Sequence, residues 1–470
     1  MDLHVSLDGP GDRATRIYLT VREAVVDGVL APGDRLPASR DLAHQLGVAR
    51  GTVTVAYDRL AAEGFLETRP GAGTFVTAVP FAAASPRGAR PGAVRPLPLW
   101  VRDPEPEPTR SRLLHDLSIG LPDPDLFPLE VWRRLVADQL RRSRLAEATY
   151  SGRGSWRLRS EIARLLGLSR SVVATGDDVL VTAGAQQAVD LVCRVLVGPG
   201  TVVAVEDPGY AAVHRLFETH RARVRGVPVD DEGLVVDAVP RGARVVYVTP
   251  SHQFPTGIPM SLARRVALLR WAVEHDAVVV EDDYDSEYRW SDHPVEPLQS
   301  LDRDGRVVYV GTFSKTLLPG LRVGYIVAPR SLQPALHEAK RVSTWEGDLT
   351  TQGALAAFLG EGHHAAHVRR ARKVYRARRD LLLDGLAGLD DVLTVLPSVA
   401  GLHVAVRFVD EATDDADVVA RAAARGVRVE ALSAYRREQP CRPGLALGFG
   451  GLAVDAVPEA LRRLEAAVRG

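Results

Sequence analysis

The sequence predicts an α/β protein in which a small helical unit precedes a large unit built around a mainly parallel sheet. Three observations support this. The 470 residues exceed what one ordinary domain needs. After residue 113, short valine-rich segments without polar alternation alternate with helical stretches, which is typical of parallel strands covered on both faces. Between Pro80 and Pro108, eight of the 31 prolines interrupt the chain.

The composition is that of a globular protein, with 46% hydrophobic and 25% charged residues. Basic and acidic residues both number 59, which excludes a wholly basic nucleic-acid coat but leaves a local basic patch open. No apolar stretch approaches the ~20 residues that a bilayer needs, and the N-terminal residues lack the pattern of a signal peptide. Cys193 and Cys441 form neither a disulfide framework nor a metal-ligand set. We expect a cytoplasmic protein without a metal.

Residues 1–78 predict three helices followed by a hairpin. Apolar residues recur at helical spacing over 17–29, and another amphipathic helix begins near Arg50. Ser39 is placed to cap the short helix between them. Two β-prone runs then flank a Pro-Gly-Ala-Gly turn at 70–73.

The proline-rich stretch predicts a linker, so we expect one domain at 1–78, the linker at 79–112 and a second domain at 113–470. The alternative is a long surface loop of one large domain. The second domain has six segments that predict buried strands, and LHVAVRF predicts a strand of a smaller C-terminal α+β portion. The six segments are DDVLVTA, TVVAVED, ARVVYVT, AVVVEDD, RVVYVGT and RVGYIVA.

Two helices, a turn and a hairpin form an arrangement that places one helix in the major groove of DNA while the hairpin contacts adjacent backbone. Arg50, Thr52 and Thr54 lie at outward positions near the start of the third helix, where an arginine can pair with guanine. Residues 1–77, however, hold eight arginines against ten acidic residues. A small docking module with solvated arginines is therefore the alternative.

The run DRLPASRDLAHQLGVARGTVTVAYDRLAAEGFLETRPGAGTFV resembles the winged helix-turn-helix of GntR-type regulators. The resemblance implies binding to double-stranded operator DNA. Ala49 and Gly51 depart from residues common in the family, which affects the expected operator sequence. The implied DNA contacts are Arg40, Arg50, Thr52, Thr54, Arg69, Gly71 and Gly73.

Lysine is scarce: only Lys315, Lys340 and Lys373 offer an amine. Lys315 directly follows a predicted buried strand, and ligands of open α/β sheets bind at the carboxyl ends of the strands. An amine at this position can form a Schiff base with an aldehyde cofactor, which an arginine cannot do.

Polar and aromatic side chains follow the ends of other predicted strands. They suit one ligand: hydroxyls, a guanidinium and a helix N-terminus for a phosphate, a carboxylate for a protonated ring nitrogen, and an aromatic ring for stacking. Each alone has an ordinary alternative, such as a cap or core packing. The residues concerned are Ala185, Gln186, Tyr210, Asp282, Tyr284, Thr312, Ser314 and Arg322.

Roughly residues 113–465 resemble fold-type I aminotransferases, and the whole chain resembles MocR-type regulators, which fuse a GntR winged helix to such a domain. The matching stretches are TAGAQQAVDLV, VEDPGY, TPSHQFPTG, EDDYDSEYRW, GTFSKTLLPGLRVGY and GLALGFG. The resemblance implies pyridoxal 5'-phosphate (PLP) as cofactor. It makes Lys315 the Schiff-base lysine, Asp282 the partner of the ring nitrogen and Tyr284 the donor to the ring hydroxyl oxygen. The resemblance also implies that the phosphate is held by Ala185, Gln186, Thr312 and Arg322, and that Tyr210 stacks on the ring.

Two departures from the aminotransferase pattern concern the substrate. Phe254 replaces the asparagine of the N-P-x-G motif, and His252 or Gln253 is the expected substitute. Ala446 replaces the arginine that binds the substrate α-carboxylate, unless Arg436, Arg442 or a partner subunit's arginine supplies the charge.

The sequence therefore predicts a PLP-binding transcriptional regulator that senses PLP or a PLP–amine adduct, as a regulator of PLP supply would. The resemblance implies a head-to-tail homodimer, with a small amine or amino acid as a further effector. It also leaves room for part of a transamination reaction. The rival interpretations are a metabolic aminotransferase with an N-terminal docking domain and a DNA-binding scaffold with an inactive second domain.

Overall fold

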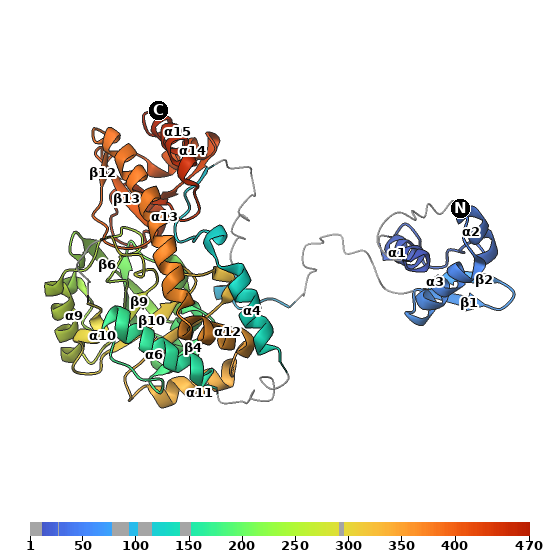
Figure 1. Cartoon of the computed structure of the whole chain (residues 1–470), viewed down its shortest axis with the longest axis horizontal. Coiled ribbons are helices and arrows are strands. Elements are labelled where there is room, and N and C mark those ends of the chain that lie inside the picture. The colour runs from blue at the N-terminus through green and yellow to red at the C-terminus, as the bar shows by residue number, and fades with distance from the viewer. Residues whose placement is uncertain (1–11, 27, 78–93, 102–114, 142–151, 291–295) are drawn as a thin grey trace. The chain divides into compact units, whose positions relative to one another are not determined.

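The computed structural model describes residues 12–26, 28–77, 94–101, 115–141, 152–290 and 296–470. The chain divides into two compact units, Met1–Val101 and Arg102–Gly470 (Figure 1). The linker predicted at 79–112 lies mostly outside the described residues; within it, Pro98–Trp100 forms a 3-10 turn.

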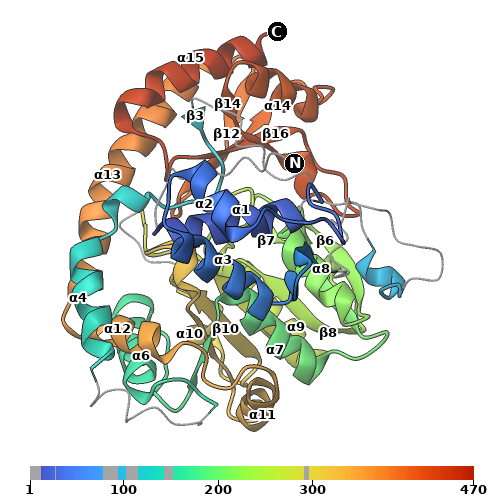
Figure 2. The ribbon, with the colours of Figure 1, turned by 90° about the vertical axis from the view of Figure 1, so that its right-hand side faces the viewer.

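The first unit contains the helices α1 (Arg13–Val26), α2 (Ser39–Leu46) and α3 (Arg50–Ala62), which Figure 2 shows side by side. The strands β1 (Leu66–Arg69) and β2 (Gly73–Val76) form the predicted antiparallel hairpin. The helices share one apolar core that includes Ile17, Val21, Leu42, Val53 and Leu60.

The prediction that Ser39 caps α2 is wrong. Ala38 is the N-cap residue, and no side chain caps this helix. Ser39 is the first helical residue, a position from which its hydroxyl does not reach the free N–H groups of the first turn. Instead, its Oγ accepts a 3.4 Å hydrogen bond from Nε of Arg50. The link joins the start of α2 to the start of α3.

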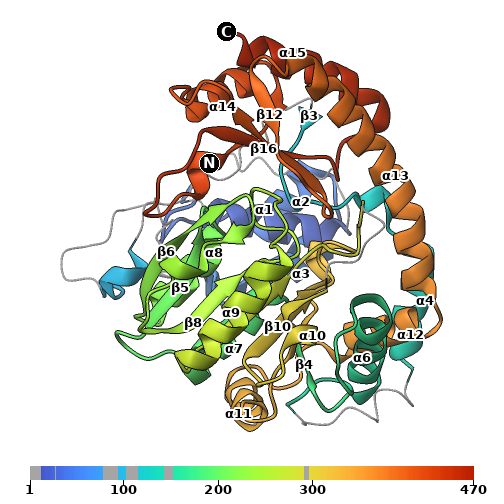
Figure 3. The same cartoon turned by 90° about the vertical axis from the view of Figure 1, so that its left-hand side faces the viewer.

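The large unit is built on an eight-stranded sheet, shown in Figure 3, with the order β4-β11-β10-β9-β8-β5-β6-β7. Its middle strands, from β10 to β6, are parallel to one another. The bounds are β4 Val179–Thr182, β5 Val202–Asp207, β6 Arg223–Asp230, β7 Gly233–Leu234, β8 Ala243–Val248, β9 Val278–Asp283, β10 Val307–Thr312 and β11 Gly324–Val327.

All six segments predicted as strands belong to this sheet, but β11 runs antiparallel to both of its neighbours. The reason is the connection from Thr312 to Gly324, which contains only the 3-10 turn Pro319–Leu321. A parallel return needs a crossover of a dozen or more residues, usually with a helix. The short connection therefore reverses the chain direction.

Helices cover both faces of the sheet, which explains why its strands lack polar alternation. Val203 and Val205 pack with α7 (Ala185–Leu196) and α8 (Ala211–Thr219) on one face. Ala204, between them, packs with α9 (Leu262–Glu274) on the other. Further helices are α4 Leu129–Gln139, α6 Trp156–Arg170, α10 Leu298–Leu301, α11 Gln333–Ser343 and α12 Leu349–Gly360.

The C-terminal portion is the predicted α+β part. Its sheet has the order β12-β13-β16-β15, and the segment LHVAVRF contains β13. The strands are β12 Leu393–Val395, β13 His403–Phe408, β15 Glu430–Ala431 and β16 Gly444–Gly448, while β14 Val427–Arg428 pairs with β3 His115–Asp116. The helices are α13 His363–Leu386, α14 Asp415–Ala424 and α15 Val457–Val468. No helix in the described parts of the chain is long and apolar enough to cross a membrane.

Candidate cofactor and DNA-binding sites

A cavity of about 390 Å³ lies where the predicted strand-end residues meet in the large unit. It also receives residues from the segment after β3 and from the C-terminal portion, such as Gly120 and Glu430. All nine residues that the sequence assigned to the cofactor line it: Ala185, Gln186, Tyr210, Asp282, Tyr284, Thr312, Ser314, Lys315 and Arg322.

Lys315 follows β10 and brings the amine into the cavity. Its Nζ donates a 2.7 Å hydrogen bond to the backbone oxygen of Gly120. Burial lowers the pKa of this amine, while the carboxylates of Asp285 and Asp282 act in the opposite direction. A lowered pKa enlarges the fraction of neutral amine, which is the nucleophilic form.

Asp282 lies at the carboxyl end of β9 and is buried. Its Oδ2 accepts a 2.5 Å hydrogen bond from the hydroxyl of Tyr247, but its Oδ1 is buried without a hydrogen-bond partner. Burial raises the pKa of Asp282 to about 6. A buried acceptor without a donor is costly, so this carboxylate is suited to a ligand that brings a positively charged N–H group.

The start of α7 and Arg322 form a place for an anion. Gly184 precedes α7 with a φ of +91°, and a Cβ there would lie 2.9 Å from Nη2 of Arg322. The same Nη2 donates to the backbone oxygen of Ala183 at 2.8 Å. Thr312 and Ser314 add two hydroxyls, whose oxygens lie 2.9 Å apart. A helix N-terminus, a guanidinium and hydroxyls together suit a phosphate group.

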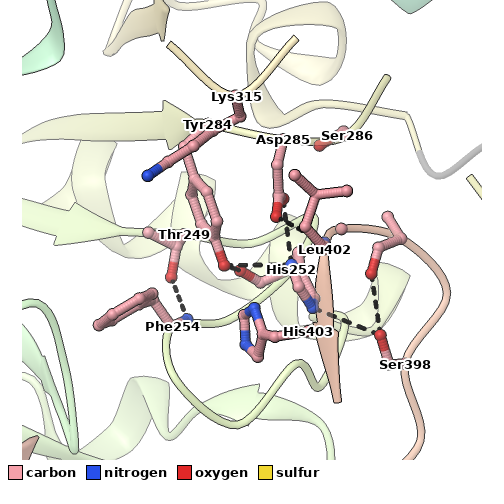
Figure 4. Close-up of polar contacts among 12 residues, drawn as sticks. Thr249, His252, Phe254, Tyr284, Asp285, Ser286, Lys315, Ser398, Leu402 and His403 are labelled. Carbon is pink, nitrogen blue, oxygen red and sulfur yellow. Dashed lines mark hydrogen bonds and ion pairs between the residues drawn. The ribbon is translucent and has the colours of Figure 1, made fainter. Parts of the chain in front are cut away.

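Tyr284 belongs to a buried polar chain that Figure 4 shows. Its hydroxyl donates to the backbone oxygen of His252 at 2.9 Å and lies 3.1 Å from Nδ1 of the same residue. That Nδ1 lies 3.0 Å from Oδ1 of Asp285. Burial would raise the pKa of Asp285, but His252, with smaller contributions from His403 and Lys315, more than offsets burial, and the pKa is lowered. Tyr284 thus lines the cavity with its hydroxyl already fixed by a neighbour.

The expected substitutes for the missing asparagine do not line the cavity. His252 takes part in the chain with Tyr284 and Asp285. Gln253 directs its Nε2 to the backbone oxygens of Pro208 and Phe254, at 2.9 and 2.7 Å. Phe254 itself faces the cavity, where its ring meets Tyr210 edge-on at 5.3 Å.

On the first unit, the residues implied as DNA contacts lie around the start of α3 and on the hairpin. Arg40, Arg50, Thr54, Arg69 and Gly71 are exposed, whereas Thr52 and Gly73 are partly buried. Opposite them, α3 buries Val53, Ala56, Tyr57 and Leu60.

The hairpin tip depends on two glycines with positive φ, Gly71 at +75° and Gly73 at +119°. Arg69, beside them, pairs with Glu67 and lies over the ring of Phe75 at 4.9 Å. A Cβ at Gly73 would lie 2.9 Å from Nε of Arg35, whereas nothing lies within 4 Å of one at Gly71. The tip backbone at Gly71 is therefore open to a close approach.

Comparison with known proteins assigns both units. Residues 13–76 match the family of bacterial regulatory proteins, gntR family, and residues 114–439 match aminotransferase class I and II. The probable rhizopine catabolism regulatory protein MocR of Rhizobium meliloti is 36% identical over 96% of this chain and 93% of its own length. The chain belongs to the MocR-type transcriptional regulators.

Further similarities cover one or both units of this MocR-type chain. The pyridoxine biosynthesis regulator PdxR of Corynebacterium glutamicum is 34% identical over 99% of both chains. Among solved structures, the kynurenine aminotransferase of Pyrococcus horikoshii superposes with a TM-score of 0.70 at 29% identity, covering 75% of this chain and 90% of that one. The predicted aminotransferase fold of the large unit is thus confirmed.

In this MocR-type regulator, neither of the two substitutes that the same chain offers for the missing carboxylate-binding arginine reaches the cavity. Arg436 is exposed, and Arg442 pairs with Glu411 at 2.9 Å on the surface. Ala446 is fully buried in β16. Arg322 is the sole arginine among the described residues that line the cavity. The interpretation that Arg436 or Arg442 fills the gap is therefore not supported.

Sequence reasoning missed several residues of the cavity. Tyr247 holds Asp282 but stands in a run of valines that predicts only a core strand. Tyr435, Glu430, Ile119 and Gly120 also line the cavity. The one available signal was the tyrosine in ARVVYVT, since a buried tyrosine hydroxyl needs a partner. Nothing local in the sequence marked the others.

Proposed function

We propose that this MocR-type regulator binds operator DNA through its first unit and PLP, or a PLP–amine adduct, through the cavity of its large unit. The observation that carries the proposal is the meeting of Lys315, Asp282 and Arg322 in one cavity. With such a function, we expect the protein to act in the cytoplasm.

The residues fit the cofactor at three points. The unpartnered Oδ1 of Asp282 fits a protonated ring nitrogen, and the amine of Lys315 fits an aldehyde. Arg322, with the space that Gly184 leaves for its guanidinium, fits a phosphate. When bound, PLP supplies an aldehyde that joins amines covalently and a ring that withdraws electrons.

In this assignment each residue has a separate role. Lys315 would hold the aldehyde carbon through Nζ, and Asp282, positioned by Tyr247, would keep the ring nitrogen protonated. Ala185, Gln186, Thr312, Ser314 and Arg322 would bind the phosphate. Tyr210 would cover a face of the ring, and Tyr284, whose hydroxyl donates to the backbone oxygen of His252, would lie beside the ring hydroxyl.

For DNA, Arg50, Thr52 and Thr54 on α3 read the major groove, and the hairpin with Arg69, Gly71 and Gly73 contacts the adjacent groove or backbone. Arg40 contacts phosphate at the start of α2. Two such units in a head-to-tail homodimer would read two half-sites. Cofactor or adduct then shifts the population between two arrangements of the readers.

A metabolic aminotransferase is the weaker alternative. The gntR-family match and the absence of an arginine at Ala446 both disfavour it, because that arginine orients the substrate. The cavity nevertheless retains the groups for part of a transamination. A steady-state assay with pairs of amino acids and keto acids separates a regulator with residual activity from an enzyme.

The test is covalent capture of the cofactor. The purified protein is expected to be yellow, and borohydride reduction followed by peptide mapping should place the label on Lys315. Lys315→Ala should abolish the label, whereas Lys373→Ala, which changes an exposed lysine of α13, should keep it. A label on Lys340 or Lys373, or a protein that is colourless after incubation with excess PLP and removal of the unbound PLP, would contradict the assignment.

A further inference from the structure

We propose that the effector beside PLP is an amine that carries a second cationic group and no carboxylate, and that Glu430 selects it. The inference rests on the proposed function, since it concerns the part of the cavity that PLP would leave free.

The charges of the cavity support this choice. Apart from tyrosines, four ionisable side chains from the described residues of the chain line it: Asp282, Lys315, Arg322 and Glu430. In the proposed PLP complex, Asp282 would contact the ring nitrogen, Lys315 the aldehyde and Arg322 the phosphate. Only Glu430 remains, together with the backbone oxygen of Gly120 that Lys315 now occupies. Both remaining groups accept hydrogen bonds, so the matching ligand group is a donor with positive charge.

The position of Glu430 strengthens the argument. Glu430 in β15 pairs in register with Ala446 in β16, the position at which the aminotransferase pattern has its carboxylate-binding arginine. No arginine is present at Ala446, which is fully buried, and its register partner Glu430 instead lines the cavity with a carboxylate. A ligand carboxylate would meet a like charge, whereas an ammonium group would meet an opposite one.

The carboxylate of Glu430 is held in place. Its Oε1 accepts a 3.0 Å hydrogen bond from the backbone N–H of Ile119, and its Oε2 accepts one from the hydroxyl of Tyr435. An ionised carboxylate offers about four acceptor sites, so acceptor capacity remains for a ligand.

Aromatic rings beside Glu430 favour the same kind of ligand. The ring of Tyr435 meets that of Phe254 edge-on at 5.1 Å, and Phe254 continues to Tyr210. All three rings line the cavity. A cation near aromatic faces gains from cation–π attraction, which a carboxylate does not.

The alternative is that Glu430 only anchors the segment at Ile119. A matched ligand series separates the two roles: 1,4-diaminobutane, butylamine and 4-aminobutanoate share a four-carbon amine and differ in the far group. Titration calorimetry of the PLP-loaded full-length protein should give the tightest binding for the diamine, about 10- to 100-fold tighter than for butylamine. The 4-aminobutanoate should bind most weakly.

Glu430→Gln should remove most of the preference for diamine over butylamine, and Tyr435→Phe, which keeps the ring, should reduce it. Glu411→Gln is the matched control, because Glu411 is an exposed glutamate of the same portion that pairs with Arg442 outside the cavity. The control should keep the wild-type preference.

The PLP content of each sample is measured first by absorbance, so that failure to bind PLP can be distinguished from failure to prefer the diamine. A protein that takes up no PLP contradicts the proposed function and the inference with it. A PLP-loaded protein that prefers 4-aminobutanoate, binds none of the three amines, or keeps its preference in both cavity variants contradicts the inference alone.

Discussion

At the residue scale, one buried carboxyl group lines the cavity and two others lie behind residues near it, and their pKa values are shifted in different directions. Burial raises the pKa of Asp282 to about 6 and that of Glu206 to about 7. The pKa of Asp285, which is also buried, is lowered because His252 lies against it. The group beside the expected ring nitrogen is therefore poised to ionise when a cation arrives.

Asp282 predicts a pH dependence of PLP retention. Above about pH 6 the carboxylate is ionised and attracts a protonated ring nitrogen; below it the group is protonated and the attraction is lost. Retention measured by dialysis should fall as the pH drops from 7 to 5. Asp282→Asn should weaken retention about 10-fold or more at pH 7 and flatten this profile. An unchanged profile in the variant would exclude Asp282 as the titrating group.

Glu206 predicts a pH dependence of stability. Its Oε2 accepts hydrogen bonds from the N–H and the hydroxyl of Thr249, and its Oε1 has no partner, so glutamine can replace it with similar shape. The pKa is about 7 in the folded protein and ordinarily 4.5. Between these values the unfolded chain loses a proton that the folded chain keeps, so the free energy of unfolding falls as pH rises.

Between pH 4.5 and about 7, Glu206 alone lowers the free energy of unfolding by about 3 kcal/mol, as the difference between its two pKa values implies. Glu206→Gln should remove this loss, so the variant gains stability relative to the wild type between pH 5 and 8. Urea unfolding of the PLP-free protein, followed by tryptophan fluorescence, reports mainly on the large unit, which holds five of the six tryptophans; the sixth is Trp100. If the difference in the free energy of unfolding between the wild type and the variant does not change with pH, the prediction is refuted.

At the element scale, the parallel strands could be predicted because both faces of the sheet are covered by helices, which leaves uninterrupted valine-rich runs. The direction of β11 could not, since it depends on a connection too short for a crossover. β6, with a glycine and a proline inside it, gave no strand signal. The first residues of helices were less predictable still: Ser39 was predicted to cap α2 but is its first helical residue.

The candidate site divides in the same way. Most of its nine predicted residues lie at or just after the carboxyl ends of strands, so local sequence and the geometry of parallel sheets were enough to group them. Glu430 was out of reach, because its approach depends on the β15–β16 register and on a contact with Ile119 that is 311 residues away in the chain. Tyr247 was missed because it stands in a valine-rich run that predicts only a core strand.

The helix α3 carries the prediction for DNA recognition. Arg50 is exposed at its first position, and its Nε donates a 3.4 Å hydrogen bond to Ser39 of α2, so Arg50→Ala removes no side chain from the core. If Arg50 reads a base, the variant should lose about 1–3 kcal/mol of operator binding and discriminate less at that base pair. Binding measured on single-base operator variants checks this. Equal weakening on all sequences would make Arg50 a phosphate contact instead.

At the scale of the whole molecule, one chain joins the proposed DNA-reading unit to the proposed cofactor-binding unit. Two tethered readers in a dimer bind at high effective concentration, so changing their arrangement changes operator affinity. Coupling free energies of this kind are commonly about 1–3 kcal/mol, or 5- to 150-fold in affinity.

The most direct test is the affinity of the full-length protein for the DNA upstream of its own gene, measured by footprinting with PLP and after removal of PLP. We expect a protected site whose affinity differs at least about 5-fold between the two forms, and no such difference for Lys315→Ala. A protein that protects no site in either form, or a site whose affinity is the same with and without PLP, would contradict the proposed function.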